Sequence, residues 1–223
     1  GNSMSAFLAP IHQWLFNKIQ KVNDRTELIL EEARARYGDN AEEAQALAWE
    51  SFGAPLASET SLADVIDHAN IHGWLSRQVN GAECREAAVI TELVRLQGSK
   101  AYEWIGEIFE QTGRQSGKQA RVEIGDDASP QKLYKALQND LLNGMPCDDI
   151  DEIIQSDKKG LSWLQKMIPQ RKAWRRTDAD EVELDILYQK WLIGFFSGLA
   201  PEYSFKVESA GEGREFLLEV KVK

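Results

Sequence analysis

The chain has 223 residues, and 36 acidic against 26 basic side chains give it a formal net charge of −10 at pH 7. Hydrophobic residues make up 43% and charged residues 28%, which is typical of a globular protein and excludes a disordered or fibrous one. The acidic balance opposes binding to a phosphate backbone, and no apolar run approaches the roughly 20 residues of a membrane span. We therefore expect neither nucleic acid nor a membrane as a partner.

The first half of the chain is predicted to be helical. After Pro10, which suits a first helical turn, apolar residues recur at three- and four-residue spacing until Gly38. The same periodicity and the glycines that interrupt it predict four more helices, over about 41–52, 61–80, 82–97 and up to 113.

The second half mixes strands with helices. Residues 113–129 hold glycines, polar residues and one short strand candidate at 120–124, so this segment is the predicted internal boundary. Alternation of apolar and polar residues predicts two short strands joined by a turn and two C-terminal strands joined at Gly211 and Gly213. The helices and strands predicted here, in chain order, are a helix over 129–144, strands over 149–155 and 161–167, a helix over 180–197, and strands over 203–207 and 216–222.

This order of elements predicts an α+β fold, in which an N-terminal multi-helix layer packs on a C-terminal antiparallel sheet with helices on one face. We expect a helical subdomain over 4–113 and an α+β subdomain over 114–223, or one compact domain that includes both. Residues 1–3 precede Met4 and are interpreted as additions from cloning. No basic stretch leads into an apolar segment after Met4, so the cytoplasm is the predicted location.

Two of the three histidines lie close together in the predicted helix over 61–80. His72 falls on its apolar stripe and is expected to be buried with a polar partner, while His68 faces solvent. Alternatively, the spacing of four residues places both imidazoles, with Asp64, on one metal ion, or His72 acts alone in a site. Because no HExxH motif or repeated ExxH motif supplies further ligands, we predict no metal site.

His12, Cys147 and Asp148 complete the catalytic candidates. His12 lies near the start of the first helix, where the helix dipole favours a neutral ring that can serve as ligand or base. Cys147 follows a predicted helix end and a proline turn, a place where a thiol can be exposed and act as a nucleophile beside Asp148. The alternatives are a packing histidine and a small buried cysteine.

A basic stretch over 166–176 contrasts with the acidic chain. Five of its eleven residues are lysine or arginine, and none is acidic. Arg171, Arg175 and Arg176 around Trp174 are therefore anion-binding candidates, because arginine and an aromatic ring suit an anionic or planar ligand. The alternative is a solvated loop that the acidic residues after it neutralise.

Three short strings carry a family resemblance: IHQW at 11–14, IHGWL at 71–75 and LLNGMPCDD at 141–149. They resemble segments of an uncharacterised bacterial protein family. This resemblance implies no activity that can be transferred to these positions. It does favour treating His12, His72 and Cys147 as one group.

Two functional hypotheses follow. The first is a small-molecule-binding protein or enzyme with a pocket between the helical layer and the sheet, formed with His12, His72 and Cys147. The second is a non-catalytic interaction module that uses an acidic helical surface or the basic 166–176 stretch. No cofactor is predicted, because neither a GxGxxG nor a P-loop motif occurs. The distance between the three side chains in the fold separates the hypotheses.

Overall fold

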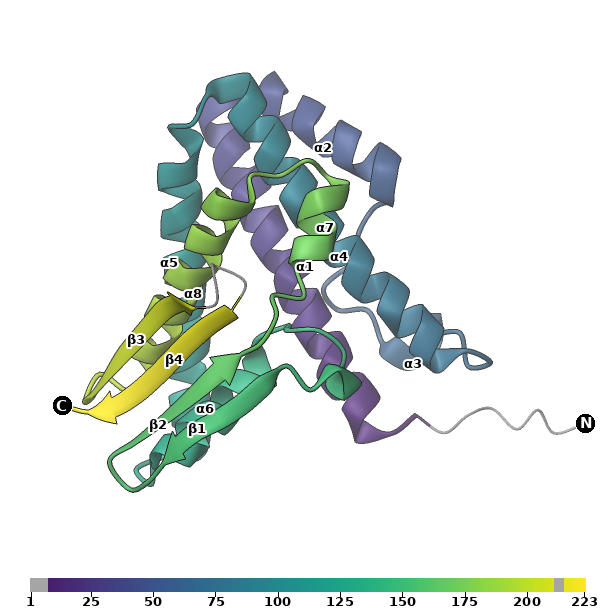
Figure 1. Cartoon of the computed structure of the whole chain (residues 1–223). Coiled ribbons are helices and arrows are strands. Elements are labelled where there is room, and N and C mark those ends of the chain that lie inside the picture. Colours follow the sequence, from purple (N-terminus) through teal and green to yellow (C-terminus); the bar gives the residue numbers. More distant parts are fainter. Residues whose placement is uncertain (1–7, 211–214) are drawn as a thin grey trace, which may run out of the picture.

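The computed structural model describes residues 8–210 and 215–223 and has the predicted α+β class, with 64% of the chain in helices (Figure 1). The predicted turn at Gly211 and Gly213 and the residues interpreted as cloning additions lie outside the described residues. The elements are α1 (Pro10–Tyr37), α2 (Asp39–Phe52), α3 (Leu62–Val65), α4 (Ile71–Gln97), α5 (Ala101–Ile124), α6 (Pro130–Asp140), the 3-10 turn η1 (Pro146–Asp148), β1 (Asp151–Ser156), β2 (Gly160–Gln165), α7 (Arg171–Arg176), α8 (Glu181–Leu199), β3 (Tyr203–Ala210) and β4 (Glu215–Val222).

The helix predicted over 61–80 is wrong in its extent. The structure has the short α3, an irregular stretch, and then α4, which continues without a break through the predicted boundary near residue 81. Asp67 accepts a hydrogen bond from the backbone N–H of Ala69, and the Asn70 side chain caps α4 by accepting one from Gly73. These short side chains compete with the helical hydrogen bonds, so the chain leaves the helix and starts a new one.

The boundary predicted at 113–129 is also wrong, because α5 continues to Ile124 and includes the strand predicted at 120–124. Its glycines are packing positions against α8. A Cβ atom on Gly117 would lie 2.0 Å from the carbonyl oxygen of Phe195, and one on Gly194 would lie 2.1 Å from that of Glu110. The two helix backbones therefore approach closely, which only residues without a side chain allow.

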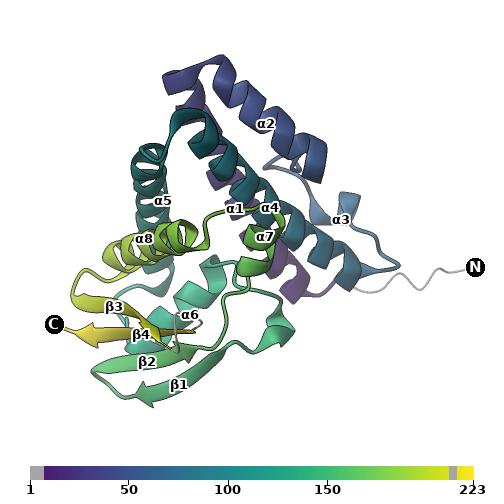
Figure 2. The same ribbon diagram turned by 45° about the horizontal axis from the view of Figure 1, so that its top comes forward.

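The four strands form one antiparallel sheet, as the sequence predicted, and their order in the sheet is β1-β2-β4-β3. Helices α6 and α8 lie on one face of this sheet, between it and the other helices (Figure 2). On that face, the Trp163 ring packs edge-on against Tyr134 of α6 at 4.9 Å between centroids and also contacts Phe196 of α8. Trp163 is 1% exposed, so it anchors the sheet to the helices.

Two clusters of buried apolar residues form the core. The larger joins the second halves of α1 and α4 to α2, α5, α6, α8 and the sheet. The smaller joins the first halves of α1 and α4 to α3 and to Leu142. Within the described residues, no helix has the length and apolar character needed to cross a membrane.

Candidate functional site

None of the cavities described below has His12, His72 or Cys147 in its lining. Five cavities in the described part of the chain are lined by other residues. His72 is exposed in the first turn of α4, so the prediction that it is buried is wrong. The reason is the helix break before Asn70, which changes the phase of the apolar stripe and places His68 outside any helix.

The other candidates have local contacts. His12 is partly buried, and its Nδ1 accepts a hydrogen bond from the backbone N–H of Ala9 at 3.0 Å, which caps α1. Cys147 is exposed in η1. The Asp148 Oδ2 atom accepts a hydrogen bond from the backbone N–H of Met145 at 2.7 Å and so closes that turn. These contacts stabilise chain turns and do not form a catalytic pair.

The basic stretch forms the short helix α7 and not a loop. Trp174 is 1% exposed and packs on Tyr188, so its ring is not available to an anion. Arg171 and Arg175 line one cavity, and Arg176 lines another, between α2 and α4. The four predicted anion-binding residues are thus divided among three environments.

A cavity of about 400 Å³ lies between α1, α6 and the segment that leads into β1. We call it the Lys18 cavity. Its apolar walls include Ile11 and Trp14, and its polar lining includes Lys18, Tyr134 and Asp151. The residues that line it differ from those that the sequence predicted, and among the described residues Asp151 is its one residue from a strand of the sheet.

Lys18 is a buried lysine on α1, with 4% of its surface exposed. Its Nζ donates a hydrogen bond to the backbone carbonyl of Gln138 at 3.1 Å and lies 3.3 Å from the centre of the Trp14 ring. Burial lowers the pKa of Lys18 to about 7, against the opposing effect of Asp140. A large fraction of this amine is therefore uncharged, and so nucleophilic, near neutral pH.

Asp151 lines the same cavity from the first residue of β1. Its Oδ2 accepts hydrogen bonds from the Tyr134 hydroxyl at 2.7 Å and the Gln138 amide at 3.2 Å. Its Oδ1 is buried and has no hydrogen-bond partner among the described residues. Burial raises the pKa of Asp151, against these hydrogen bonds. Lys18 and Asp151 are thus both shifted toward their neutral forms in one cavity, a pattern typical of functional sites.

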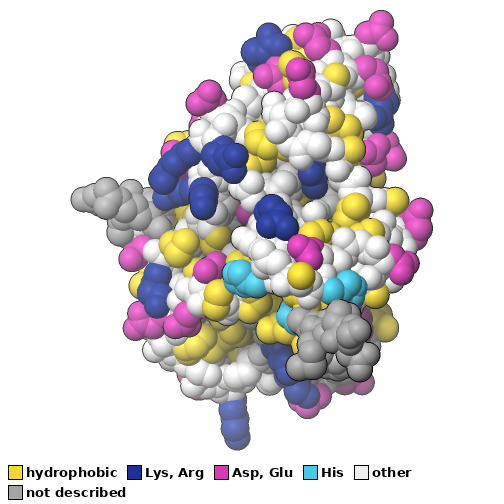
Figure 3. Space-filling view, turned by 90° about the vertical axis from the view of Figure 1, so that its right-hand side faces the viewer, with side chains coloured by type: hydrophobic (Ala, Val, Ile, Leu, Met, Phe, Trp, Pro, Cys, Tyr) yellow, Lys and Arg dark blue, Asp and Glu magenta, His cyan; other side chains and the backbone are white. Residues whose placement is uncertain are grey.

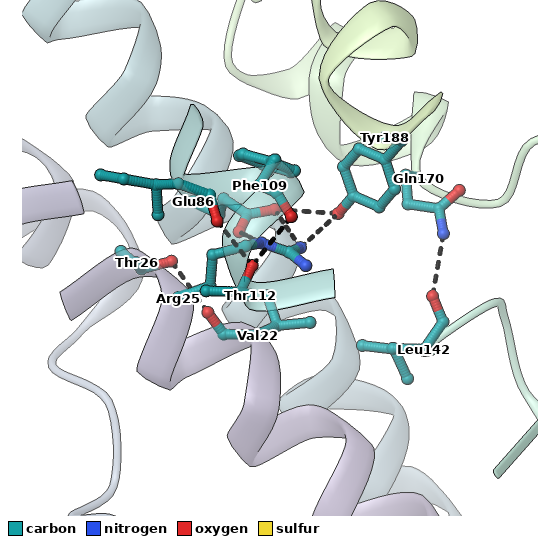
Figure 4. Close-up of polar contacts among 10 residues, drawn as sticks. Val22, Arg25, Thr26, Glu86, Phe109, Thr112, Leu142, Gln170 and Tyr188 are labelled. Carbon is teal, nitrogen blue, oxygen red and sulfur yellow. Dashed lines mark hydrogen bonds and ion pairs between the residues drawn. The ribbon is translucent and has the colours of Figure 1, made fainter. Parts of the chain in front are cut away.

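A second cavity, of about 240 Å³, lies on the other side of Lys18 between α1, α5 and α8. Arg25 and Tyr188 line it, and they join Glu86 in a buried network (Figure 4). Arg25 contacts the Glu86 carboxylate through two nitrogens, at 2.7 and 2.9 Å, and the Tyr188 hydroxyl donates to the same carboxylate at 2.9 Å. This bidentate pair fixes α1, α4 and α8 relative to one another.

A third cavity, which we call the α4–α7 cleft, has a volume of about 600 Å³ and is lined by α4, α7 and the residues around η1. Glu83 forms part of its lining and is 6% exposed. Burial, with a smaller effect from Glu86, raises the pKa of Glu83 to about 8. Lysine and arginine side chains gather on this side of the molecule (Figure 3), and Lys166 and Lys172 are among those at the cleft.

Sequence reasoning missed Lys18, Asp151 and Glu83. Lys18 carries a usable signal, because it lies three residues after Leu15 and four before Val22 on the apolar stripe of α1. Asp151 and Glu83 have no comparable signal. Asp151 is the third aspartate of an acidic run, and Glu83 lies next to a predicted helix boundary that does not exist.

No family model and no curated protein matches this sequence. Among solved structures it is similar to H-NOX domains at low identity. An oxygen-binding H-NOX domain related to soluble guanylate cyclases is 15% identical, with a TM-score of 0.39 over 87% of this chain and 91% of that one. An H-NOX mutant with an unnatural amino acid is 14% identical, with a TM-score of 0.36 over 90% and 96% of the chains, and a third H-NOX structure is 11% identical, with a TM-score of 0.34 over 87% and 92%.

The prediction of no cofactor is contradicted by this comparison, because H-NOX domains bind haem. Haem iron is most often held by a histidine or a cysteine that points into the haem pocket. No histidine or cysteine lines any of the five cavities described above in residues 8–210 and 215–223. The side chains present in these cavities therefore do not fit a histidine- or cysteine-ligated haem, and we derive no chemistry through one.

Proposed function

We propose that this chain is a small-molecule-binding protein whose ligand occupies the Lys18 cavity and presents a carbonyl group to the Lys18 amine. The observation that carries the proposal is the position of Lys18. This buried amine lines two cavities, and among the described residues it donates one hydrogen bond, to a backbone carbonyl. Burying a lysine is unfavourable to folding, because burial disfavours its charged form. The position of Lys18 in a cavity therefore favours a functional role for its amine.

The reaction available to the Lys18 amine and a ligand carbonyl group is imine formation. The uncharged Lys18 nitrogen forms a bond to the carbonyl carbon, and the carbon–oxygen bond breaks as the oxygen leaves as water. The nitrogen releases two protons in this process, and the departing oxygen takes up two. The Asp151 carboxylate can relay these protons, because it takes up each proton from the nitrogen before it passes it to the oxygen. The reaction needs no oxidant or reductant.

The sequence candidates have no part in this proposal. His12, His72 and Cys147 lie outside the Lys18 cavity, and Asp148 is engaged by a backbone N–H. The alternative of an interaction module is supported by surface charge alone, whereas the Lys18 cavity has a specific shape and reactive groups.

Reductive trapping tests the proposal. The protein is incubated at pH 7 with pyruvate, glyoxylate or propanal and with cyanoborohydride, which reduces an imine to a stable secondary amine, and each lysine is then quantified by peptide mass spectrometry. We expect Lys18 to be modified on the order of ten times faster than the exposed Lys118 of α5, because a larger fraction of its amine is uncharged.

Two variants make the result specific. Lys18→Met should abolish the fast modification, and Lys118→Met, the matched control, should leave it unchanged. Circular dichroism and thermal melting verify that both variants are folded. Modification of Lys18 at the rate of the exposed lysines with all three carbonyl compounds would contradict the proposal.

A further inference from the structure

We infer that the α4–α7 cleft is a second ligand site, which binds a small phosphate-bearing molecule through Lys172 and Arg175 at its rim and Glu83 at its floor. This site is separate from the Lys18 cavity and does not depend on the function proposed there. The inference stands on three observations. These are the basic charge of the lining, the buried and unpartnered carboxyl oxygen of Glu83, and the different contacts that the arginines of α7 make.

The lining of the cleft is locally basic in a protein with a net charge of −10. Four lysine and arginine residues line it, against the two acidic residues Asp148 and Glu83. The Asp148 carboxylate is engaged by the backbone N–H of Met145, so it is directed toward its own turn. A compact group of cations with no free carboxylate at the surface favours an anion, and arginine suits the geometry of phosphate oxygens.

The arginines of α7 differ in how they are held. Arg171 pairs with Asp185 at 2.9 Å, and both side chains are largely buried, which anchors α7 to α8. The Arg175 side chain is 69% exposed, and its contact with Glu181 at 3.2 Å lies at the surface. Such an exposed pair contributes little stability, so Arg175 can exchange Glu181 for a phosphate at low cost. Lys172, also exposed, lies on the same rim.

Glu83 is the feature that distinguishes this cleft from an ordinary basic surface. Only 6% of the Glu83 surface is exposed, and its Oε2 has no hydrogen-bond partner in the described part of the chain. With its pKa raised to about 8, the carboxyl group is mostly protonated at neutral pH and can donate a hydrogen bond. A buried polar atom without a partner is costly, and a phosphate oxygen in the cleft would satisfy it.

The size of the cleft is suited to a small organic ligand. Its volume of about 600 Å³ lies within the range of roughly 300–1,000 Å³ that is common for small-molecule sites. Val79, Met167 and Ile168 supply apolar surface beside the charged rim. The ligand class that fits is therefore a phosphate attached to a small, partly apolar body.

The protein contains a matched control for charge. Arg176 follows Arg175 on α7 but lines the cavity between α2 and α4. Arg175→Glu and Arg176→Glu change the net charge equally and alter neighbouring positions of one helix. Only the first of them changes the α4–α7 cleft.

Isothermal titration calorimetry with pyrophosphate as the probe, and citrate as a non-phosphate trianion, tests the inference on the full chain. We expect pyrophosphate to bind more tightly than citrate. Lys172→Glu and Arg175→Glu should each weaken pyrophosphate binding about tenfold or more, and Arg176→Glu less than about threefold. Glu83→Gln, which keeps a donor, should bind within about threefold of the wild type, whereas Glu83→Leu should lose about tenfold.

Three outcomes would overturn the inference. These are equal losses in Arg175→Glu and Arg176→Glu, equal affinity for citrate and pyrophosphate, and no heat of binding with pyrophosphate. None of them affects the trapping of carbonyl compounds at Lys18, so failure here and failure of the proposed function remain distinguishable. Thermal melting of each variant confirms that a lost affinity does not reflect unfolding.

Discussion

Individual buried charges in this protein are held in two different ways. Arg25 and Glu86 neutralise each other through a bidentate contact, and the Tyr188 hydroxyl occupies a further lone pair of the carboxylate. Within the described part of the chain neither Lys18 nor Glu83 forms an ion pair, and burial shifts the pKa of each toward its neutral form. The first arrangement stabilises the fold, whereas the second keeps a reactive or donating group in a cavity at the expense of stability.

Glu83 makes the stability of the protein depend on pH. Its pKa is about 8 in the folded state against about 4.5 unfolded, so the folded state binds more protons between these values and stability falls as pH rises through them. Glu83→Gln cannot ionise and should be more stable than the wild type by about 4 kcal/mol at pH 8.5, with little difference at pH 4.5. Urea unfolding at the two pH values measures this. An equal difference at both would contradict the raised pKa.

Few of the individual residues that line the cavities were identified from the sequence. The basic stretch contributes Arg171 and Arg175 to the α4–α7 cleft, whereas the Lys18 cavity is lined by residues that were not selected from the sequence. His72 was misplaced because the phase of an apolar stripe is lost when Asp67 and Asn70 end a helix within it. Lys18 was missed because a single lysine within a helical stripe resembles a solvent-facing residue until tertiary contacts bury it.

Among the elements, the glycines of α5 have the largest effect on how the sequence is interpreted. Glycine clusters predict loops when only local propensity is considered, and this caused the strand and boundary predictions at 113–129 to fail. In the structure, Gly113 and Gly117 face Gly194 and Gly198 across a crossing where carbonyl oxygens would touch any Cβ atom. Helices and strands with regular periodicity, such as α1, α8 and β4, were predicted correctly because their signals are local.

The crossing predicts opposite effects for two glycines of α5. Gly117→Ala would place its Cβ 2.0 Å from the backbone oxygen of Phe195, which cannot move alone, so we expect a loss of about 2–4 kcal/mol. At Gly106 the nearest atom is the end of the Lys190 side chain, which can swing away. Gly106→Ala should therefore be neutral or stabilise by up to about 1 kcal/mol through helix propensity. Denaturant unfolding of both variants checks this, and similar losses would contradict the packing explanation.

At the scale of the whole molecule, the Lys18 cavity and the α4–α7 cleft are joined by one segment. Gly144 and Met145 line both of them. The Gln170 amide holds this segment by donating hydrogen bonds to the Leu142 carbonyl at 2.9 Å and the Asn143 side chain at 3.1 Å. Because Gln170 lies just before α7, the wall between the cavities is fixed to the same helix that carries the cleft arginines.

This arrangement predicts that Gln170→Ala affects both ligand sites at once. Loss of the amide leaves the buried Leu142 carbonyl without that donor, so we expect the protein to lose about 1–2 kcal/mol of stability. Carbonyl trapping at Lys18 and pyrophosphate binding should both fall by severalfold. The control is Gln131→Ala, which removes an amide bound to Ser156 and Asp157 at the exposed β1–β2 turn and should change neither. A Gln170→Ala effect on one site only would contradict the shared wall.

The strand β1 lies at one edge of the open sheet. The regularity of its pairing with β2 affects whether a strand of another molecule can pair with this edge. Its pairing with β2 shifts between Ile153 and Gln155, so the free edge does not present an even row of backbone donors and acceptors. Ile153 and Ile154 are about half exposed there, at 47% and 55%, a composition that would otherwise favour sheet-to-sheet aggregation. The irregularity thus protects an apolar edge by geometry, and a substitution that straightened β1 would make the folded protein prone to polymerise strand against strand.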